Sequence, residues 1–204
     1  MSEQQIFNVL VEFFEEDEWD FQWMEGESIL SMGFSGKNGK WQCFAQAREA
    51  QEQFVFYSVL PVNVPPEKRL KVAELITRIN YGMVIGNFEM DFDDGEVRYK
   101  TSVDVEGSEL TLPMIRQMVY ANILITDRYL PAVMRAIYSD ISPVEAIAKA
   151  DEEAAMSVKE ALDALFDEEE DDNLLDELDD DNDFDADDSD GGPMANGSGP
   201  YNLN

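Results

Sequence analysis

Hydrophobic positions in the first 60 residues change from helical spacing to alternation. Residues 6–14 are apolar at i, i+3, i+4 and i+7, which predicts a helix that ends at the acidic run beginning with Glu15. Trp19, Phe21 and Trp23 alternate with polar residues and indicate an extended lead-in. Three strands are then expected, at about residues 28–35, 41–49 and 53–60. The third of them is apolar at consecutive positions, so we expect it to be central or covered on both faces.

Three later stretches also have helical spacing. The first covers about residues 66–81 and the second, a long one, about residues 111–138. Pro131 lies inside the long stretch and is expected to kink or split it, because a proline ring clashes with the preceding turn and lacks an amide hydrogen. A capping-box sequence at Ser142 predicts the start of a short helix, and residues 151–166 predict a second short amphipathic helix.

A hairpin between the first two of these helices has the most specific pattern in the chain. Apolar and charged residues alternate on both sides of Asp94-Gly95, a dipeptide that favours a two-residue turn. Such a turn pairs Phe92 with Val97 on one face. On the other face it pairs Glu89 with Lys100, so that opposite charges meet. Strands joined by tight turns are antiparallel, and the sequence therefore predicts an α+β fold: a five-stranded antiparallel sheet with helices packed on one face.

Net charge is unevenly distributed along the 204 residues, and most of the excess negative charge lies at the C-terminal end. The chain carries 45 acidic and 14 basic residues, a net charge of −31. Residues 151–204 hold 21 acidic residues and one basic residue, and so contribute −20 of that total. From residue 167 onward Asp, Glu, Asn and Gly dominate, and such a segment buries too little apolar surface to offset an ordering cost of about 1–2 kcal/mol per residue. We therefore expect residues 167–204 to be a disordered acidic tail.

Residue types that are missing or rare exclude several functions. There is no histidine and the only cysteine is Cys43, so no serine or cysteine triad, no imidazole or thiolate zinc site and no intrachain disulfide can form. A chain this acidic repels nucleic acid phosphates. No apolar run approaches the roughly 20 residues that span a bilayer, and the N-terminus has no signal-peptide pattern. We expect a cytoplasmic protein with no cofactor, no nucleic-acid partner and no membrane insertion.

Two sets of apolar residues do not fit a single buried core. The long helix has a second apolar line beside its main one, formed by Met114, Met118, Ala121 and Ile125. A helix that is apolar over more than half of its circumference needs cover on two sides, from the same chain, from a dimer partner or from a client peptide. The acidic tail also carries apolar residues, which are Leu174, Leu175, Leu178 and Phe184. Such an alternation favours either docking on a groove or basic partner, or a tail that only keeps the protein in solution.

Five stretches of the chain are similar to one known family. They are Arg69–Glu74, Arg78–Gly82, Ile85–Asp91, Glu96–Thr101 and Asp127–Pro131. With them, residues 57–147 resemble the YbjN domain, a family described as bacterial regulators of sensory transduction, and the likeness extends over about residues 1–148 once the first helix and strands are included. The resemblance implies a fold like that of type III secretion chaperones, which are small, acidic and often dimeric α+β proteins that hold client segments along a sheet or helix surface. It supplies no catalytic residues, and the acidic tail lies outside the family's pattern.

The sequence supports three hypotheses about function, in this order. The first is a non-enzymatic protein-binding module, chaperone-like or regulatory, that binds another protein or client segment and forms a homodimer through the long helix. The second is a structural subunit of a larger assembly. The third is an enzyme that uses carboxylates alone, for instance with a divalent metal. The carboxylates Glu89, Asp91, Asp93, Asp94 and Glu96 could be a metal site, but we interpret them as structural, because Lys100 and Arg98 on the opposite strand would compete with a cation. The expected organisation is a YbjN-like domain at 1–150, the short helix at 151–166 and then the tail.

Overall fold

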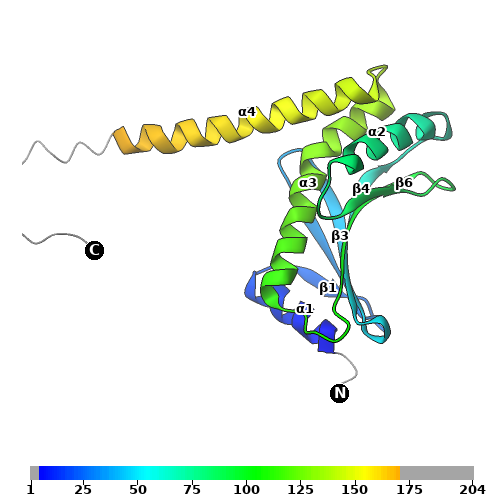
Figure 1. Cartoon of the computed structure of the whole chain (residues 1–204), viewed down its shortest axis with the longest axis vertical. Coiled ribbons are helices and arrows are strands. Elements are labelled where there is room, and N and C mark those ends of the chain that lie inside the picture. The colour runs from blue at the N-terminus through cyan, green and yellow to red at the C-terminus, as the bar shows by residue number, and fades with distance from the viewer. Residues whose placement is uncertain (1–4, 171–204) are drawn as a thin grey trace, which may run out of the picture. The chain divides into compact units, whose positions relative to one another are not determined.

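Six strands form one antiparallel sheet in the computed structural model, which describes residues 5–170 (Figure 1). Their order across the sheet is β1-β2-β3-β4-β6-β5, so β3 and β4 lie at its centre. The strands are β1 Phe21–Trp23, β2 Ile29–Ser35, β3 Lys40–Arg48, β4 Gln53–Asn63, β5 Asn87–Met90 and β6 Glu96–Asp104. The α+β class and the antiparallel pairing predicted from the sequence are confirmed.

The sheet has one strand more than the five predicted. The extra strand is β1, whose Phe21 pairs with Met32 of β2. The alternation at residues 19–23 indicates extended backbone, but a strand of three residues is too short to specify its partner from pattern alone. Pairing with β2 holds this segment at the sheet border, and Trp23 Nε1 donates a hydrogen bond of 3.0 Å to the carbonyl oxygen of Glu27.

Four α-helices accompany the sheet in the described residues, together with two short 3-10 turns. They are α1 Gln5–Glu16, α2 Arg69–Tyr81, α3 Leu112–Tyr138 and α4 Pro143–Glu170, and the turns are η1 Glu49–Gln51 and η2 Pro66–Lys68. Helix α1 lies against β3, α3 against β4 and β6, and α2 against β5, all on one face of the sheet (Figure 1). The predicted placement of helices on one face is therefore confirmed. The described residues up to Ala161 form one compact unit.

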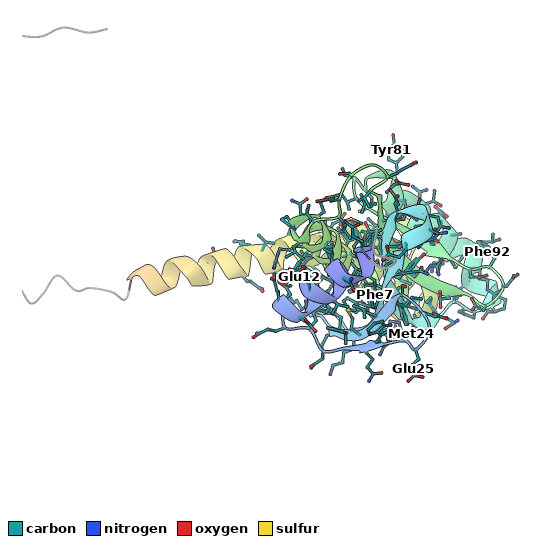
Figure 2. All side chains as sticks on the ribbon, turned by 90° about the horizontal axis from the view of Figure 1, so that it is seen from below. Phe7, Glu12, Met24, Glu25, Tyr81 and Phe92 are labelled. Carbon is teal, nitrogen blue, oxygen red and sulfur yellow. The ribbon has the colours of Figure 1, made fainter. Side chains whose placement is uncertain are left out.

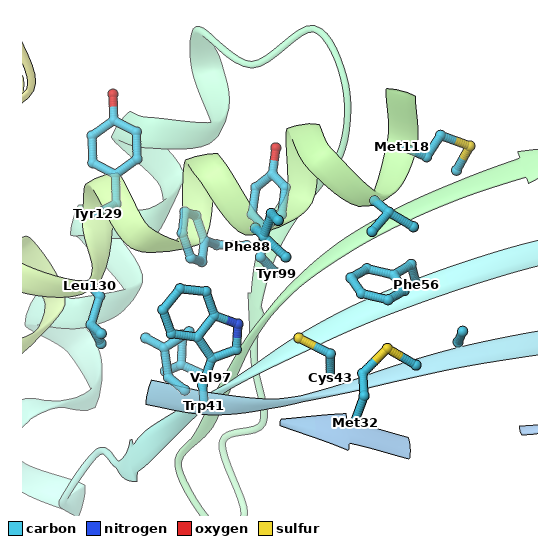
Figure 3. Packing of buried hydrophobic residues seen from close by; sticks show 14 of the residues in the cluster. Met32, Trp41, Cys43, Phe56, Phe88, Val97, Tyr99, Met118, Tyr129 and Leu130 are labelled. Atoms are coloured by element: carbon cyan, nitrogen blue, oxygen red, sulfur yellow. The ribbon is translucent and has the colours of Figure 1, made fainter. Parts of the chain in front are cut away.

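The core lies between these three helices and the sheet (Figure 3). A fully buried polar residue, Asn122 of α3, reaches across this core to the sheet. Its side-chain amide donates to the backbone carbonyl oxygens of Phe56 at 3.1 Å and Tyr99 at 3.2 Å. Because these carbonyls belong to neighbouring strands, β4 and β6, this one side chain fixes where α3 lies on the sheet.

Helix α3 continues through Pro131, where the sequence predicts a kink or a split, and it is not split. Proline cannot donate the helical hydrogen bond to the carbonyl oxygen four residues earlier, which belongs to Asp127. The side-chain amide of Asn38 donates to that oxygen instead, at 3.0 Å. The turn between β2 and β3 therefore supplies the partner that Pro131 cannot, and the helix remains one element of 27 residues.

The β5–β6 hairpin has a register shifted by two residues from the predicted one, and the predicted pairing is wrong. Val97 pairs with Met90 instead of Phe92, and Arg98 pairs with Glu89. Side chains alternate with a period of two along a strand, so a shift of two leaves apolar residues on one face and charged residues on the other. The alternation in the sequence therefore fits both registers equally well.

A five-residue loop, Asp91–Gly95, produces this shift and leaves Phe92 outside the strand, 52% exposed. The carboxylate of Asp91 accepts a hydrogen bond of 2.7 Å from the backbone amide of Asp93. Gly95 has a φ of +83°, a conformation that glycine adopts without strain. These local features favour the longer loop over the two-residue turn predicted from the sequence.

Helix α4 is a single helix of 28 residues where two short helices are predicted. It begins at the predicted capping box: the Ser142 hydroxyl accepts from the amide of Glu145 at 3.2 Å, and the Glu145 carboxylate accepts from the amide of Ser142 at 3.1 Å. No glycine or proline between residues 144 and 170 ends the helix. Residues 167–170 belong to α4, and the rest of the predicted tail lies outside the described residues.

Candidate protein-docking surface

The predicted second apolar line of α3 is partly enclosed by the chain itself. Met118 is 8% exposed and belongs to the core, while Met114, Ala121 and Ile125 are partly buried. Met114 and Ile125 pack against the core cluster. Much of the cover that this line requires therefore comes from the same chain, and a role of these residues in binding a partner stays a prediction. The apolar tail residues predicted to bind a partner lie outside the described residues; they are Leu174, Leu175, Leu178 and Phe184.

Helix α3 exposes three other apolar side chains, Tyr120 at 39%, Leu124 at 65% and Tyr138 at 69%. The Tyr120 hydroxyl donates to the carboxylate of Asp17 at 2.8 Å, and Arg116 pairs with the same carboxylate at 2.5 Å. Burial alone would raise the pKa of Asp17, but hydrogen bonds, the largest of them from Tyr120, outweigh burial and lower that pKa. Asp17 is therefore an ionised anchor between the end of α1 and α3.

A hollow of about 610 Å³ lies between the β2–β3 turn, α3 and α4. Its walls combine apolar side chains of both helices with two arginines. Arg128 pairs with Asp151 at 2.8 Å, and Arg135 pairs with Glu153 at 2.5 Å. Both pairs join α3 to α4, so the charges of these arginines serve the attachment of α4 and are already balanced within the chain.

The face of the sheet opposite the helices is covered by no described helix (Figure 1). We call it the open sheet face. Strand pairing places its side chains in a central row of Ser31, Phe44, Tyr57 and Lys100, flanked by one row of Gln46, Val55 and Ser102 and another of Gln42, Val59 and Arg98. Val55 is only 4% exposed, and Phe44, Tyr57 and Val59 are partly buried. Neighbouring side chains of the same face therefore shield this apolar centre.

One property of the open sheet face, its apolar central strand, can be predicted from the sequence. The run of apolar residues over 54–57 predicts that the third strand is central or covered on both faces. This strand, β4, is central as predicted, but the helices cover only one of its faces. Its outward residues Val55, Tyr57 and Val59 are thus apolar on a face where a solvated sheet normally carries polar residues.

Two cations frame Tyr57 on this face. The guanidinium carbon of Arg98 lies 4.5 Å from the centroid of the Tyr57 ring, within the range of a cation–π contact. Arg98 and Lys100 both pair with Glu89 of β5, Arg98 at 3.3 Å. Burial opposes ionisation of Glu89, but the hydrogen bonds and charges of Lys100 and Arg98 outweigh it and lower the pKa of Glu89. The aromatic ring and its two cations are therefore held together as a unit.

Charge on the open sheet face differs in sign from that of the whole chain. By strand alternation its cations are Lys40, Arg48, Arg98 and Lys100, and its carboxylates are Glu89, Glu96 and Asp104. The face therefore carries a net charge of +1, in a chain whose net charge is −31. A segment that is both acidic and apolar would find complementary charge here.

Groups that could carry covalent or metal chemistry are few among residues 5–170. Cys43 is fully buried, and burial raises the pKa of its thiol to about 11. The Ser58 hydroxyl lies 3.4 Å from its sulfur. Within that part of the chain no three carboxylates or thiols are grouped so that they could hold a metal ion.

No helix of the described range is long and apolar enough to cross a membrane.

Apolar side chains also project from the end of α2 and from the loop that follows it, and Figure 2 shows Tyr81, the last residue of α2, pointing away from the fold. Tyr81 and Val84 are 96% and 97% exposed. The Tyr99 hydroxyl donates to the carbonyl oxygen of Ile85 at 2.5 Å and fixes the end of this loop. Their exposure could not be predicted from the sequence, because no periodic pattern around the end of α2 and the following loop separates exposed from buried apolar positions.

Asn80 and Gly86 belong to the stretches Arg78–Gly82 and Ile85–Asp91, and both have a structural role in the fold. The side chain of Asn80 accepts from the backbone amide of Phe88 at 2.8 Å and donates to its carbonyl oxygen at 2.9 Å. Gly86 has a φ of +79°, and a Cβ at this position would lie 2.6 Å from the carbonyl oxygen of Lys100. Both residues position the α2–β5 loop, so their role is in the architecture.

Comparisons with known proteins agree with the resemblance seen in the sequence. The family model YbjN, described as "Putative bacterial sensory transduction regulator", matches residues 7–135. No curated protein matches the sequence. The crystal structure of YbjN from E. coli is 12% identical, with a TM-score of 0.46, and the match covers 59% of this chain and 85% of that chain.

Two complexes are also similar in structure. For the HopA1–SchA chaperone–effector complex the identity is 18% and the TM-score 0.41, and the match covers 63% of this chain and 94% of that chain. For the ExsC–ExsE complex the identity is 15% and the TM-score 0.42, with 62% and 90% covered. At these values the similarity does not extend to shared partners or sites.

Proposed function

Because the chain belongs to the YbjN family, we propose that it is a non-catalytic protein-binding adaptor, chaperone-like or regulatory, which docks another protein on the open sheet face. The observation that carries this proposal is the central strand β4. Its residues Val55, Tyr57 and Val59 point away from the helices and are apolar. The description of the family as a regulator of sensory transduction is compatible with an adaptor.

Burial of apolar side chains supplies the driving force for docking. Fully burying a valine or phenylalanine side chain is worth about 1.5–3 kcal/mol. Phe44, Tyr57 and Val59 are already partly buried, so a partner that covers them gains roughly 1 kcal/mol from each. The surrounding cations contribute orientation and association rate more than affinity. The surface therefore suits a partner that binds reversibly.

Support for a non-catalytic role comes from what the reactive groups of residues 5–170 already do. The thiol of Cys43 is buried with a raised pKa, so it is neither ionised near neutral pH nor accessible. The carboxylate of Glu89 is engaged by Lys100 and Arg98. A metal ion or a substrate proton would have to displace these partners. The predicted homodimer and cytoplasmic location remain predictions from the sequence.

Site-specific photo-crosslinking tests where the partner docks. We expect p-benzoylphenylalanine at position 44, on the open sheet face, to capture a partner that the same group at position 124, on α3, does not capture. Tyr57→Asp should reduce capture at least about ten-fold, because it places a charge in the apolar centre of the face. Leu124→Asp is the matched control: it adds the same charge at an exposed position and should leave capture unchanged.

Two outcomes decide against this assignment. Capture from position 124 that survives Tyr57→Asp would place the docking surface on α3. Equal capture in the Tyr57→Asp variant and the unsubstituted chain would exclude the open sheet face. Thermal unfolding followed by circular dichroism should show that both aspartate variants are folded, so that a loss of capture reports binding and not unfolding.

A further inference from the structure

We propose that a hollow beside the start of α1 binds a basic and apolar segment of a partner protein. The hollow has a volume of about 620 Å³, within the range of roughly 300–1,000 Å³ that is usual for ligand clefts. None of its lining residues belongs to the open sheet face, so the inference goes beyond the proposed function and does not depend on it. Three properties support this occupant: the way the walls are held, the apolar floor and the charge of the rim.

The walls come from three segments that are far apart in the sequence: the start of α1, the turn η1 with the residue after it, and the loop between β6 and α3 (Figure 1). The carboxylate of Glu49 accepts hydrogen bonds from the backbone amides of Ile6 at 3.2 Å and Phe7 at 2.8 Å, and so joins η1 to α1. The carbonyl oxygen of Glu52 accepts from the amide of Val105 at 2.9 Å, which joins η1 to the loop. The hollow is therefore formed by the fold before any ligand binds.

The floor of the hollow is apolar. Ile6, Val105 and Leu110 line it and belong to the buried core. Val9 also lines it, is partly buried and packs against the same core. An apolar side chain of a ligand that enters this concave site leaves water for an apolar surface, which is favourable. A ligand that carried only charge would leave the floor without a matching group.

The rim of the hollow is acidic. Four glutamates contribute to it, and among the described residues that line the hollow there is no lysine or arginine; the glutamates are Glu49, Glu52, Glu106 and Glu109. None of the four forms an ion pair with another described residue. Glu49 and Glu52 also bond to backbone amides, whereas Glu106 and Glu109 are exposed. The rim therefore offers uncompensated negative charge to a cationic ligand.

The spacing of these carboxylates favours a segment with several cations over a single metal ion. Within residues 5–170 no three carboxylates are grouped so that they could hold a metal. A peptide can instead place lysine or arginine side chains at successive points of the rim and its apolar side chains on the floor. An acidic lipid or a nucleic acid would be repelled by the rim.

A second copy of the chain fits the hollow less well than a segment of another protein. Each chain carries a net charge of −31, so two copies repel one another as they approach. A basic partner is attracted by the same charge. The hollow thus selects a partner whose charge is opposite to that of a segment suited to the open sheet face, which carries a net charge of +1.

Fluorescence anisotropy with designed peptides tests the proposal on the full chain. A labelled peptide that alternates arginine and leucine should bind at least about ten-fold more tightly than either of two control peptides. One control alternates arginine and serine and has the same charge, and the other alternates glutamate and leucine and has the same apolar content. Measurement in about 150 mM salt weakens the attraction that the net charge of the chain exerts on any cation.

A cation placed in the hollow should block the peptide. Ser108 is an exposed residue of the hollow, and Ser108→Arg should weaken binding of the arginine–leucine peptide at least about ten-fold. Ser102→Arg is the matched control, because it adds the same charge at an exposed position of β6 on the open sheet face. Binding to this control should be unchanged. Circular dichroism should show that both variants are folded.

Removal of charge from the rim gives a second pair of variants. Glu106→Gln together with Glu109→Gln should weaken binding several-fold, because each exposed ion pair contributes little by itself. Glu152→Gln together with Glu160→Gln is the matched control, since both residues are exposed on α4 and do not line the hollow. The control changes the net charge by the same amount and should leave binding unchanged.

Photo-crosslinking locates the peptide and identifies other occupants. p-Benzoylphenylalanine at position 108 should form a product with the arginine–leucine peptide, and the same group at position 102 should not. Without peptide, a product that joins a ¹⁵N-labelled to an unlabelled chain would identify a second copy as the occupant. A product with residues 162–204 of the same chain would identify an internal occupant. Either of these two products would overturn the proposal.

The remaining contrary results are equally clear. Equal weakening by Ser108→Arg and Ser102→Arg would show that only the overall charge attracts the peptide, and would refute the hollow as its site. Equal binding of the arginine–leucine and arginine–serine peptides would refute a role of the apolar floor. Neither result bears on the proposed function, which is tested separately at position 44 and with Tyr57→Asp.

Discussion

The side-chain amide of Asn38 donates a hydrogen bond of 3.0 Å to the backbone carbonyl oxygen of Asp127, the one that Pro131 leaves without a helical partner. The backbone amide of Asn38 also donates to the carboxylate of Asp127, at 2.8 Å. The approach is close, since a Cβ at Gly36 would lie 2.2 Å from the same carboxylate. The β2–β3 turn and α3 are therefore joined at a point where the helix itself is incomplete.

Asn38→Ala should lower the free energy of unfolding by about 1 kcal/mol, because it removes the amide partner of the Asp127 carbonyl. The loss should be about half as large in a Pro131→Ala background, where residue 131 regains an amide hydrogen that can donate to the same carbonyl. Urea unfolding of the four chains measures this coupling as a double-mutant cycle. Equal losses in the two backgrounds would contradict the link between Asn38 and Pro131.

Glu89→Gln should destabilise the fold near neutral pH and have little effect in acid. Although burial opposes it, Lys100 and Arg98 lower the pKa of Glu89 below its ordinary value of 4.5. A carboxyl whose pKa is lower in the folded state stabilises the fold above its ordinary pKa, and this contribution is lost as the pH falls through the lowered value. The difference in unfolding free energy should be about 0.5–1 kcal/mol at pH 7 and shrink towards zero below pH 4.5.

Urea unfolding over a series of pH values checks this dependence. Glu96→Gln is the matched control, because the Glu96 carboxylate lies 3.8 Å from Arg98 and should contribute less. A cost of Glu89→Gln that stayed constant from neutral to acid pH would show that the side chain acts through packing and not through its charge.

Met118→Ala and Leu124→Ala should separate the core of α3 from its surface. Met118 is 8% exposed, so its truncation should cost about 2–4 kcal/mol. Leu124 is 65% exposed, and its truncation should change stability by less than about 0.5 kcal/mol. Chemical denaturation measures both. Similar costs for the two variants would mean that the Leu124 side chain is covered in solution.

Leu124→Asp then tests the homodimer predicted from the sequence. Met118→Asp is unsuitable for that purpose, because Met118 is buried and a charge there would disturb the fold. Light scattering at high micromolar concentration should show a dimer for the unsubstituted chain and a monomer for Leu124→Asp, if α3 forms the interface. A dimer that survives Leu124→Asp would exclude this face of α3, and a monomeric unsubstituted chain would contradict the homodimer.

Cys43 should react slowly with a thiol reagent while the chain is folded. Burial raises its pKa to about 11, so the reactive thiolate is scarce near pH 8, and the sulfur is not accessible. The rate with Ellman's reagent should be at least about 100-fold lower in buffer than in denaturant. Ser58→Ala should not restore it, because burial and not the hydroxyl protects the sulfur. Rapid reaction in buffer would show that the core opens around β3.

Features that depend on neighbours in sequence could be predicted. The capping box of Ser142 and Glu145 needs only three residues of chain, and it begins α4 as expected. The long helix was likewise predicted from its spacing, and Thr111 caps it by accepting from the amide of Met114 at 3.4 Å. The family could also be predicted, because the resemblance lies in short stretches of sequence such as Asp127–Pro131, and the family model matches residues 7–135.

Features that depend on distant contacts could not be predicted. Alternation around Val97 fits two hairpin registers, and the loop at Asp91 decides between them. Pro131 is tolerated because Asn38, far away in sequence, supplies a donor. The same applies to the candidate site: Met118 belongs to a helical pattern and Val55 to a run of consecutive apolar residues, but only the placement of the helices shows that Val55 lies on the uncovered face.

Asn80 has a consequence for how the molecule associates with others. Its side chain occupies the amide and carbonyl of Phe88, and these groups point away from β6 on the outermost strand of the sheet. An added β-strand would have to form hydrogen bonds to these two groups. A strand of another chain can therefore pair with β5 at Phe88 only if the Asn80 side chain first moves away. The β5 edge of the sheet is thereby protected against pairing of strands between molecules.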